Sequence, residues 1–181
     1  MMNKFDNLMI DLETFGVCAD AVVIEIGAVP FNFEGETGNE FEIYPEVQEQ
    51  IGNRKVEWST IKFWMSQEFE ARNKQIQAHR EFDLKNSLYK LSEFCKDNLI
   101  DDFKVWGNGF DIPLLNQAYS SFGLKTPWSY KRIMDCRTIS WLSKVSVKKF
   151  EDKLDVKHSA VSDCKFQIRF VVDSYRILKL Y

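Results

Sequence analysis

The chain has 181 residues, of which 45% are hydrophobic and 28% charged, and its formal net charge is −3. We therefore expect one globular domain over residues 1–181, with a hydrophobic core. No stretch approaches the roughly 20 apolar residues of a membrane span, and residues 1–6 lack a secretory signal pattern. The four cysteines are widely spaced without a C-x-x-C pair, which argues against a zinc site or disulfide framework and favours a cytoplasmic protein.

The net negative charge at first argues against a nucleic-acid partner, because such partners favour basic surfaces. The balance changes if four of the 27 acidic residues are metal ligands, since 23 acids then stand against 24 Lys and Arg residues, a charge of +1. A local acidic site in a nearly neutral body also explains the composition, so nucleic acid stays a candidate partner.

The first part of the chain predicts an antiparallel meander of three strands. Segments rich in β-branched and aromatic residues lie at 7–13, 21–33 and 39–44. In the second strand, Gly27 is typical of a bulge and Pro30 of an edge or an irregular position. Apolar residues then recur at helical spacing over 58–77 and 83–98.

The second part of the chain alternates strands with helices. A strand at 103–106 leads into a helix over 111–122, and a strand at 131–134 leads into a helix that Asp135 caps. A lysine-rich connector, 145–157, precedes a last helix over 159–180. Three antiparallel strands followed by strand–helix units predict an α/β fold, with a mixed sheet flanked by helices.

Two acids, Asp11 and Glu13, end the first predicted strand. Because side chains alternate along a strand, both carboxylates lie on one face while Leu12 points into a core on the other. A divalent cation would remove the repulsion between the carboxylates, and Mg²⁺ or Mn²⁺ suits oxygen ligands. A solvated strand end is the simpler explanation of these two residues taken alone.

Three more residues are candidates for the same site. Asp111 begins a helix at the carboxyl edge of a strand, where α/β sheets collect their sites, although the helix dipole alone also favours an acid there. His158 and Asp163 are five residues apart, about 140° on a helix, so they would not share a helical face. Both reach one point if His158 lies in the loop before the last helix; otherwise it is an ordinary loop histidine.

Taken in order, these residues resemble the three exonuclease motifs of the DEDD superfamily. The matches are D-x-E at 11–13, F-D at 110–111 and H-x4-D at 158–163, and the histidine places the chain in the DEDDh branch. Residues 58–65 and 106–109 look most like the phage-type exonuclease A and exoribonuclease group. The resemblance implies a ribonuclease-H-like fold.

The resemblance also implies two-metal phosphoryl chemistry with Mg²⁺ or Mn²⁺. Asp11 would bridge two divalent cations, Glu13 and Asp163 would complete one metal site, and Asp111 would support the other. His158 would be the general base that takes a proton from the attacking water, a task that its reference pKa of about 6.5 suits.

Substrate contacts are predicted around the first two motifs. By resemblance, Thr14 and Phe15 would meet the terminal nucleotide, with Phe15 stacking on or wedging beside a base; a buried Phe15 is the alternative. Trp64 would line the same pocket, although a helical Trp is more often core. Many relatives place an Asn where this chain has Gly107, which leaves the role of Asn108 open. The lysines at 144, 148, 149, 153 and 157 either follow the phosphate backbone or belong to a solvated connector.

We therefore expect a metal-dependent 3′-5′ exonuclease that releases nucleoside 5′-monophosphates from single-stranded nucleic acid, with DNA favoured; the polarity rests on the resemblance. One alternative is an exoribonuclease acting on short RNA, and another is a non-catalytic nucleic-acid-binding adaptor with the same fold. Four clustered acids argue against the adaptor, because a pure binder has no use for them. The expected partners are 3′ ends of single-stranded DNA or RNA, with a dimer left open, in the cytoplasm, or the host cytoplasm if the protein is phage-encoded.

Overall fold

The structure is a computed structural model that describes residues 4–146 and 158–178. A five-stranded sheet has the order β3-β2-β1-β4-β5. Its strands are β1 Phe5–Thr14, β2 Val23–Phe31, β3 Phe41–Ile43, β4 Leu99–Gly107 and β5 Ile133–Asp135. The pairs β1–β2 and β2–β3 are antiparallel, whereas β1–β4 and β4–β5 are parallel. The predicted mixed sheet, an antiparallel meander followed by parallel strands, is confirmed.

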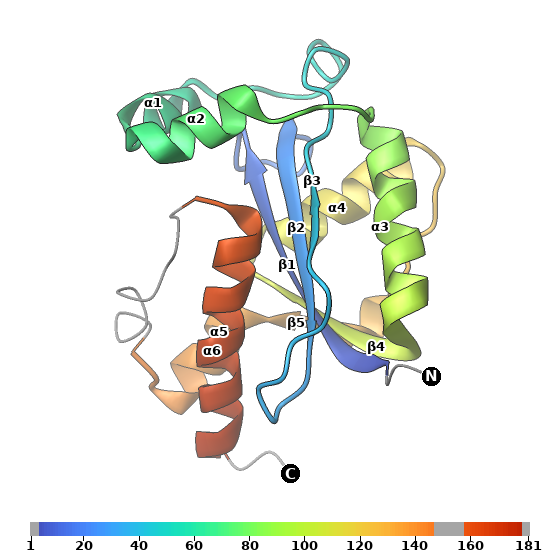
Figure 1. Ribbon diagram of the computed structural model, residues 1–181, viewed down its shortest axis with the longest axis vertical. Helices are drawn as coiled ribbons and strands as arrows, with labels where there is room; N and C mark the ends of the chain where they lie inside the picture. Colours follow the sequence, from blue (N-terminus) through green and yellow to red (C-terminus); the bar gives the residue numbers. More distant parts are fainter. Residues whose placement is uncertain (1–3, 147–157, 179–181) are drawn as a thin grey trace.

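Helices cover both faces of this sheet. They are α1 Trp58–Ser66, α2 Phe69–Gln77, α3 Leu84–Asn98, α4 Asp111–Ser121, α5 Cys136–Ser143 and α6 Ala160–Leu178, with a short 3₁₀ helix at Tyr130–Arg132. Helices α3 and α4 lie on one face, α5 and α6 on the other, and α1 and α2 lie near the end of β1 (Figure 1). No helix among residues 4–146 and 158–178 is long and apolar enough to cross a membrane.

One predicted helix is wrong in its extent. The segment 58–77 forms two helices instead of one, because the backbone is extended at Gln67 and Glu68, with ψ of 159° and 155°. Apolar spacing continues through the break, which is why the sequence pattern did not show it. The change of direction brings α2 to the sheet as a separate element.

Alternation along β1 divides its side chains between the two layers. Leu8, Ile10 and Leu12 pack in the core under α3 and α4, whereas Met9 packs in the core under α5 and α6. Asp11 and Glu13 continue the Met9 side of the strand. The two acids therefore face the layer that contains α6.

Helix α6 comes into backbone contact with β2 at Gly27. A Cβ atom at this position would lie 2.5 Å from the carbonyl carbon of Ala160 and 2.6 Å from the backbone nitrogen of Val161. The strand pairing is regular here, with Gly27 opposite Asp11, so the bulge predicted at Gly27 is wrong. Glycine is needed because it lets the first turn of α6 approach the sheet closely.

Candidate active site

The site is built on the last residues of β1. Asp11 and Glu13 are each 8% exposed, and both lie on the α6 side of the sheet, as their spacing predicted. The amide of Gln167 on α6 donates a hydrogen bond of 2.6 Å from Nε2 to Oδ1 of Asp11. This bond fixes one oxygen of the central carboxylate and leaves the other available to a ligand.

Asp111 enters from the neighbouring strand β4 through the turn after Gly107. It is the first residue of α4 and is 1% exposed. The backbone N–H of Asn108 donates to Oδ2 of Asp111 at 2.8 Å. The turn thus orients the acid through the backbone of Asn108, a contact that any residue type at 108 except proline can make.

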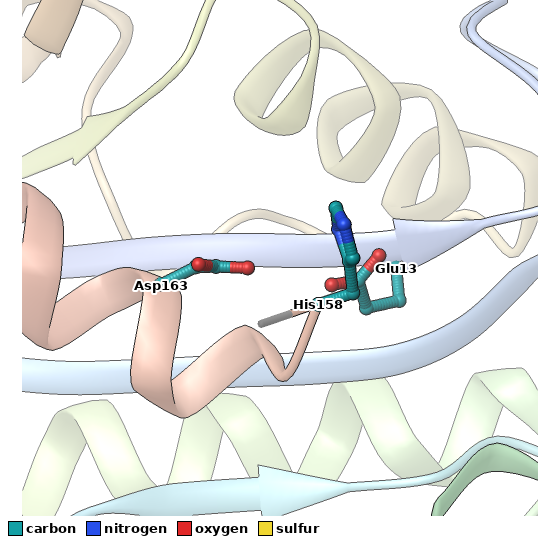
Figure 2. A group of neighbouring side chains, drawn as sticks. All are labelled: Glu13, His158 and Asp163. Atoms are coloured by element: carbon teal, nitrogen blue, oxygen red, sulfur yellow. The ribbon is translucent and has the colours of Figure 1, made fainter. Parts of the chain in front are cut away.

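His158 and Asp163 reach the site from the start of α6. His158 lies on the turn that leads into the helix, and Asp163 lies in the first helical turn (Figure 2). Ligand atoms of Glu13, His158 and Asp163 all lie within 4.8 Å of one another. The predicted placement of the histidine before the helix and the acid within it is confirmed.

The imidazole of His158 rests against aromatic rings of α1. Its ring contacts that of Phe63 edge-on, with centroids 4.9 Å apart, and that of Trp64 with centroids 6.2 Å apart. These contacts limit the orientations of the imidazole. A ring held in this way keeps its nitrogen atoms beside the carboxylates.

The four acids form one electrostatic unit. Burial, followed by the charges of Asp111, Glu13 and Asp163, raises the pKa of Asp11 well above its usual value. Burial and the charge of Asp163 do the same to the pKa of Glu13. Burial also raises the pKa of Asp111 and of Asp163 to about 7. Such a group is stable in its ionised form when cations neutralise it, and its oxygen atoms are the ligands that Mg²⁺ and Mn²⁺ prefer.

A cavity of about 1240 Å³ opens above Asp11, Glu13 and Asp163. Its walls come from β1, α1, α5, α6 and the turn between β4 and α4, and they include Thr14, Trp64 and Asn108 of the predicted substrate contacts. Trp64 is also a core residue, 7% exposed, and its indole N–H donates to the carbonyl oxygen of Thr14 at 3.0 Å. Phe15 is partly buried and packs against the cluster that contains Trp64.

The sequence matches a known protein family over most of its length. The family model of the 3′-5′ exoribonuclease Rv2179c-like domain matches residues 6–174, which include all five motif residues. The chain belongs to this family. The predicted membership of the 3′-5′ exonuclease superfamily is thereby confirmed.

The chain is also similar in sequence to a phage protein and in fold to a solved structure. The exodeoxyribonuclease of Enterobacteria phage T4 is 27% identical over 121 residues, which are 60% of this chain and 53% of the phage protein. The chain thus matches about half of the length of that relative. A solved structure, exonuclease X in complex with 5′ overhanging duplex DNA, shares the fold with a TM-score of 0.57 at 13% identity, over 97% of this chain and 94% of the other.

A further wall of the cavity contains Lys144, one of the lysines predicted to follow the phosphate backbone, together with Arg137 and Trp141, which the sequence interpretation missed as contacts. Arg137, Trp141 and Lys144 line the cavity from α5 and its C-cap, at positions i, i+4 and i+7 of one helical face. Trp141 is 77% exposed. From the sequence, the segment after Asp135 was assigned only as a capped helix, and the cap is confirmed, because the N–H of Thr138 donates a hydrogen bond to Asp135. The helical spacing of Arg137, Trp141 and Lys144 was the signal that could have revealed this face. The predicted lysines 148, 149, 153 and 157 lie outside the described residues.

Proposed function

We propose that the protein is a metal-dependent 3′-5′ exonuclease that releases nucleoside 5′-monophosphates from single-stranded nucleic acid. One observation carries this proposal: three distant segments of the chain converge on one cluster of four carboxylates, three of them buried and one half-buried, and a half-buried histidine. The cluster lies at the wall of a cavity with apolar and basic side chains. A non-catalytic adaptor would gain nothing from such repulsion between buried charges.

The donor set fits two divalent cations, Mg²⁺ or Mn²⁺. Asp11 would be shared between them, with Glu13 and Asp163 completing one set of ligands and Asp111 supporting the other. Bound there, the cations would polarise the phosphodiester and lower the pKa of the attacking water. Gln167 holds Asp11 through the 2.6 Å hydrogen bond and so keeps the shared carboxylate in one orientation.

His158 acts as the general base in this proposal. The imidazole would accept the proton of the attacking water as the new phosphorus–oxygen bond forms. The bond between phosphorus and the 3′-oxygen of the preceding nucleotide breaks in the same displacement, and that oxygen leaves as a hydroxyl after taking a proton from solvent. Its atoms lie as close to Glu13 and Asp163 as metal ligands do, so direct ligation is the competing role. A variant of His158 separates the two roles, as described in the Discussion.

The α5 face suits a single strand that leaves the site. The exposed indole of Trp141 offers a stacking surface that every base can use, and Arg137 and Lys144 would meet phosphate groups on either side of it. Similarity to a phage exodeoxyribonuclease favours DNA as the substrate. Membership of a 3′-5′ exoribonuclease domain family favours RNA, which is the second candidate.

The test uses single-stranded DNA and RNA of one sequence, labelled at the 5′ end, with Mn²⁺ and then with excess EDTA. We expect a ladder that shortens from the 3′ end, released 5′-monophosphates, and no reaction with EDTA or with Asp11→Ala. The relative rates on the two labelled strands decide between DNA and RNA. Binding of either strand without any hydrolysis would contradict the proposal and favour the adaptor.

A further inference from the structure

A fifth acid, Glu25 on β2, lies behind the cluster. It is 0% exposed and stands directly opposite Glu13 in the antiparallel pairing of β1 and β2. Its carboxylate accepts a hydrogen bond of 3.0 Å from the backbone N–H of Ala160, the first residue of α6, and another from the amide of Gln75. A fully buried carboxylate is costly unless it is paired, so this position requires a cation.

Lys74 of α2 provides that cation. Its ammonium group donates to Glu25 at 3.1 Å, to Glu42 at 2.8 Å and to the hydroxyl of Ser159. These three bonds use all three N–H donors of the ammonium group. Lys74 therefore joins strands β2 and β3 to the residue that follows His158.

Lys74 and Glu25 bind two consecutive residues, Ser159 and Ala160. Ser159 is held by Lys74 through its side chain, and Ala160 is held by Glu25 through its backbone. The residue just before them, His158, has a φ of 58°, a left-handed conformation that is unfavourable for a residue with a Cβ atom. Such a conformation persists only where the surrounding structure enforces it.

We propose that Lys74, Glu25 and Ser159 form a clamp that positions His158, by anchoring the two residues after it in the one backbone path that points the imidazole at Glu13 and Asp163. Lys74 and Glu25 are thus positioning residues, and they touch neither substrate nor cofactor. The inference rests on the proposed function, in which His158 is the general base. In this proposal the role of α2 is to place the ammonium group of Lys74 between Glu25 and Ser159, behind the site.

Ser159→Ala is the most selective test. It removes only the hydroxyl that Lys74 binds and leaves the Lys74–Glu25 ion pair in place. The Lys74 side chain is 26% exposed, so water can replace the lost acceptor and the fold should be retained. We expect kcat on the labelled strand to fall about 10–100-fold with KM unchanged, because a displacement of about 1 Å in a reacting group has that effect.

Two further variants make the test specific. Lys74→Met should lower kcat at least as much as Ser159→Ala does, and Lys74→Arg, which keeps a cation beside Glu25, should recover part of the rate. Ser174→Ala is the matched control: Ser174 is a fully buried serine of α6 whose hydroxyl accepts a hydrogen bond from Ser143, away from the cluster. It should retain the wild-type kcat.

The His158→Ala background decides whether the clamp acts through the histidine. If it does, the double variant His158→Ala/Ser159→Ala should be no slower than His158→Ala alone, because independent effects would multiply. Multiplying losses would overturn the positioning role, and so would a wild-type kcat for Ser159→Ala in an active enzyme. A wild-type protein that hydrolyses neither strand would overturn the proposed function, and the clamp inference with it.

Discussion

Gly27→Ala should disable the site without touching any of its side chains. The new Cβ would lie 2.5 Å from the carbonyl carbon of Ala160, whereas ordinary contact begins at 3.4 Å, so the start of α6 must move by roughly 1 Å. This movement carries His158 and Asp163 away from Glu13, which stays on β1. A misplacement of about 1 Å can lower a rate by about 10²-fold, and overpacking of this kind costs about 1–3 kcal/mol of unfolding free energy.

The assay measures kcat on a labelled single strand together with the thermal midpoint. We expect Gly27→Ala to remain folded, with a midpoint lower by about 2–4 °C for each kcal/mol lost, and with a kcat reduced about 10²-fold. Adding Ala160→Gly should not restore the rate, because the nearest atoms to the new Cβ belong to the backbone of Ala160 and Val161.

A folded Gly27→Ala protein with the wild-type kcat would refute this reasoning. It would mean that α6 can move by this distance without disturbing the chemistry. Recovery of the rate by Ala160→Gly would show instead that the clash is with a side chain, and that the backbone approach is not what sets the position of α6.

Four further predictions follow from the cluster. Asp11→Ala should abolish hydrolysis while the metal-free thermal midpoint holds or rises, because a repelling carboxylate is gone; near-normal cleavage with Mn²⁺ would contradict the metal assignment. Millimolar Mg²⁺ or Mn²⁺ should raise the wild-type midpoint by mass action, and should raise it less in Glu13→Ala; no rise with either cation would contradict a metal site. In EDTA, the free energy of unfolding should fall as pH rises from about 4 to about 7. Burial raises the pKa of Asp111 and Asp163 to about 7, so the folded protein binds more protons than the unfolded chain over that range. Urea titrations that give the same free energy of unfolding at every pH would contradict this prediction. His158→Ala should lose about 10²–10⁴-fold in rate yet keep the rise in midpoint with Mn²⁺, whereas loss of that rise would make His158 a ligand.

Local patterns in the sequence determined much of this protein. The alternation of β1 placed Asp11 and Glu13 on one face, and the spacing of His158 and Asp163 required His158 to lie in the loop before the helix if the two were to reach one point. The cap of Asp135 and the order of strands and helices were also predicted. Each of these inferences depends on residues within a few positions of one another, where the period of a strand or helix decides which side chains share a face.

Tertiary structure alone decided the rest. Gly27 suggested a bulge, but strand register puts it under the first turn of α6. Glu25 lies in an apolar strand and Lys74 on a polar helix, and nothing local links either residue to His158. Their roles come from pairing across strands and from the direction that α2 takes after the break at Gln67. Contacts of this kind join residues far apart in the chain, so they are set by register and packing, which the periodicity of a single segment does not encode.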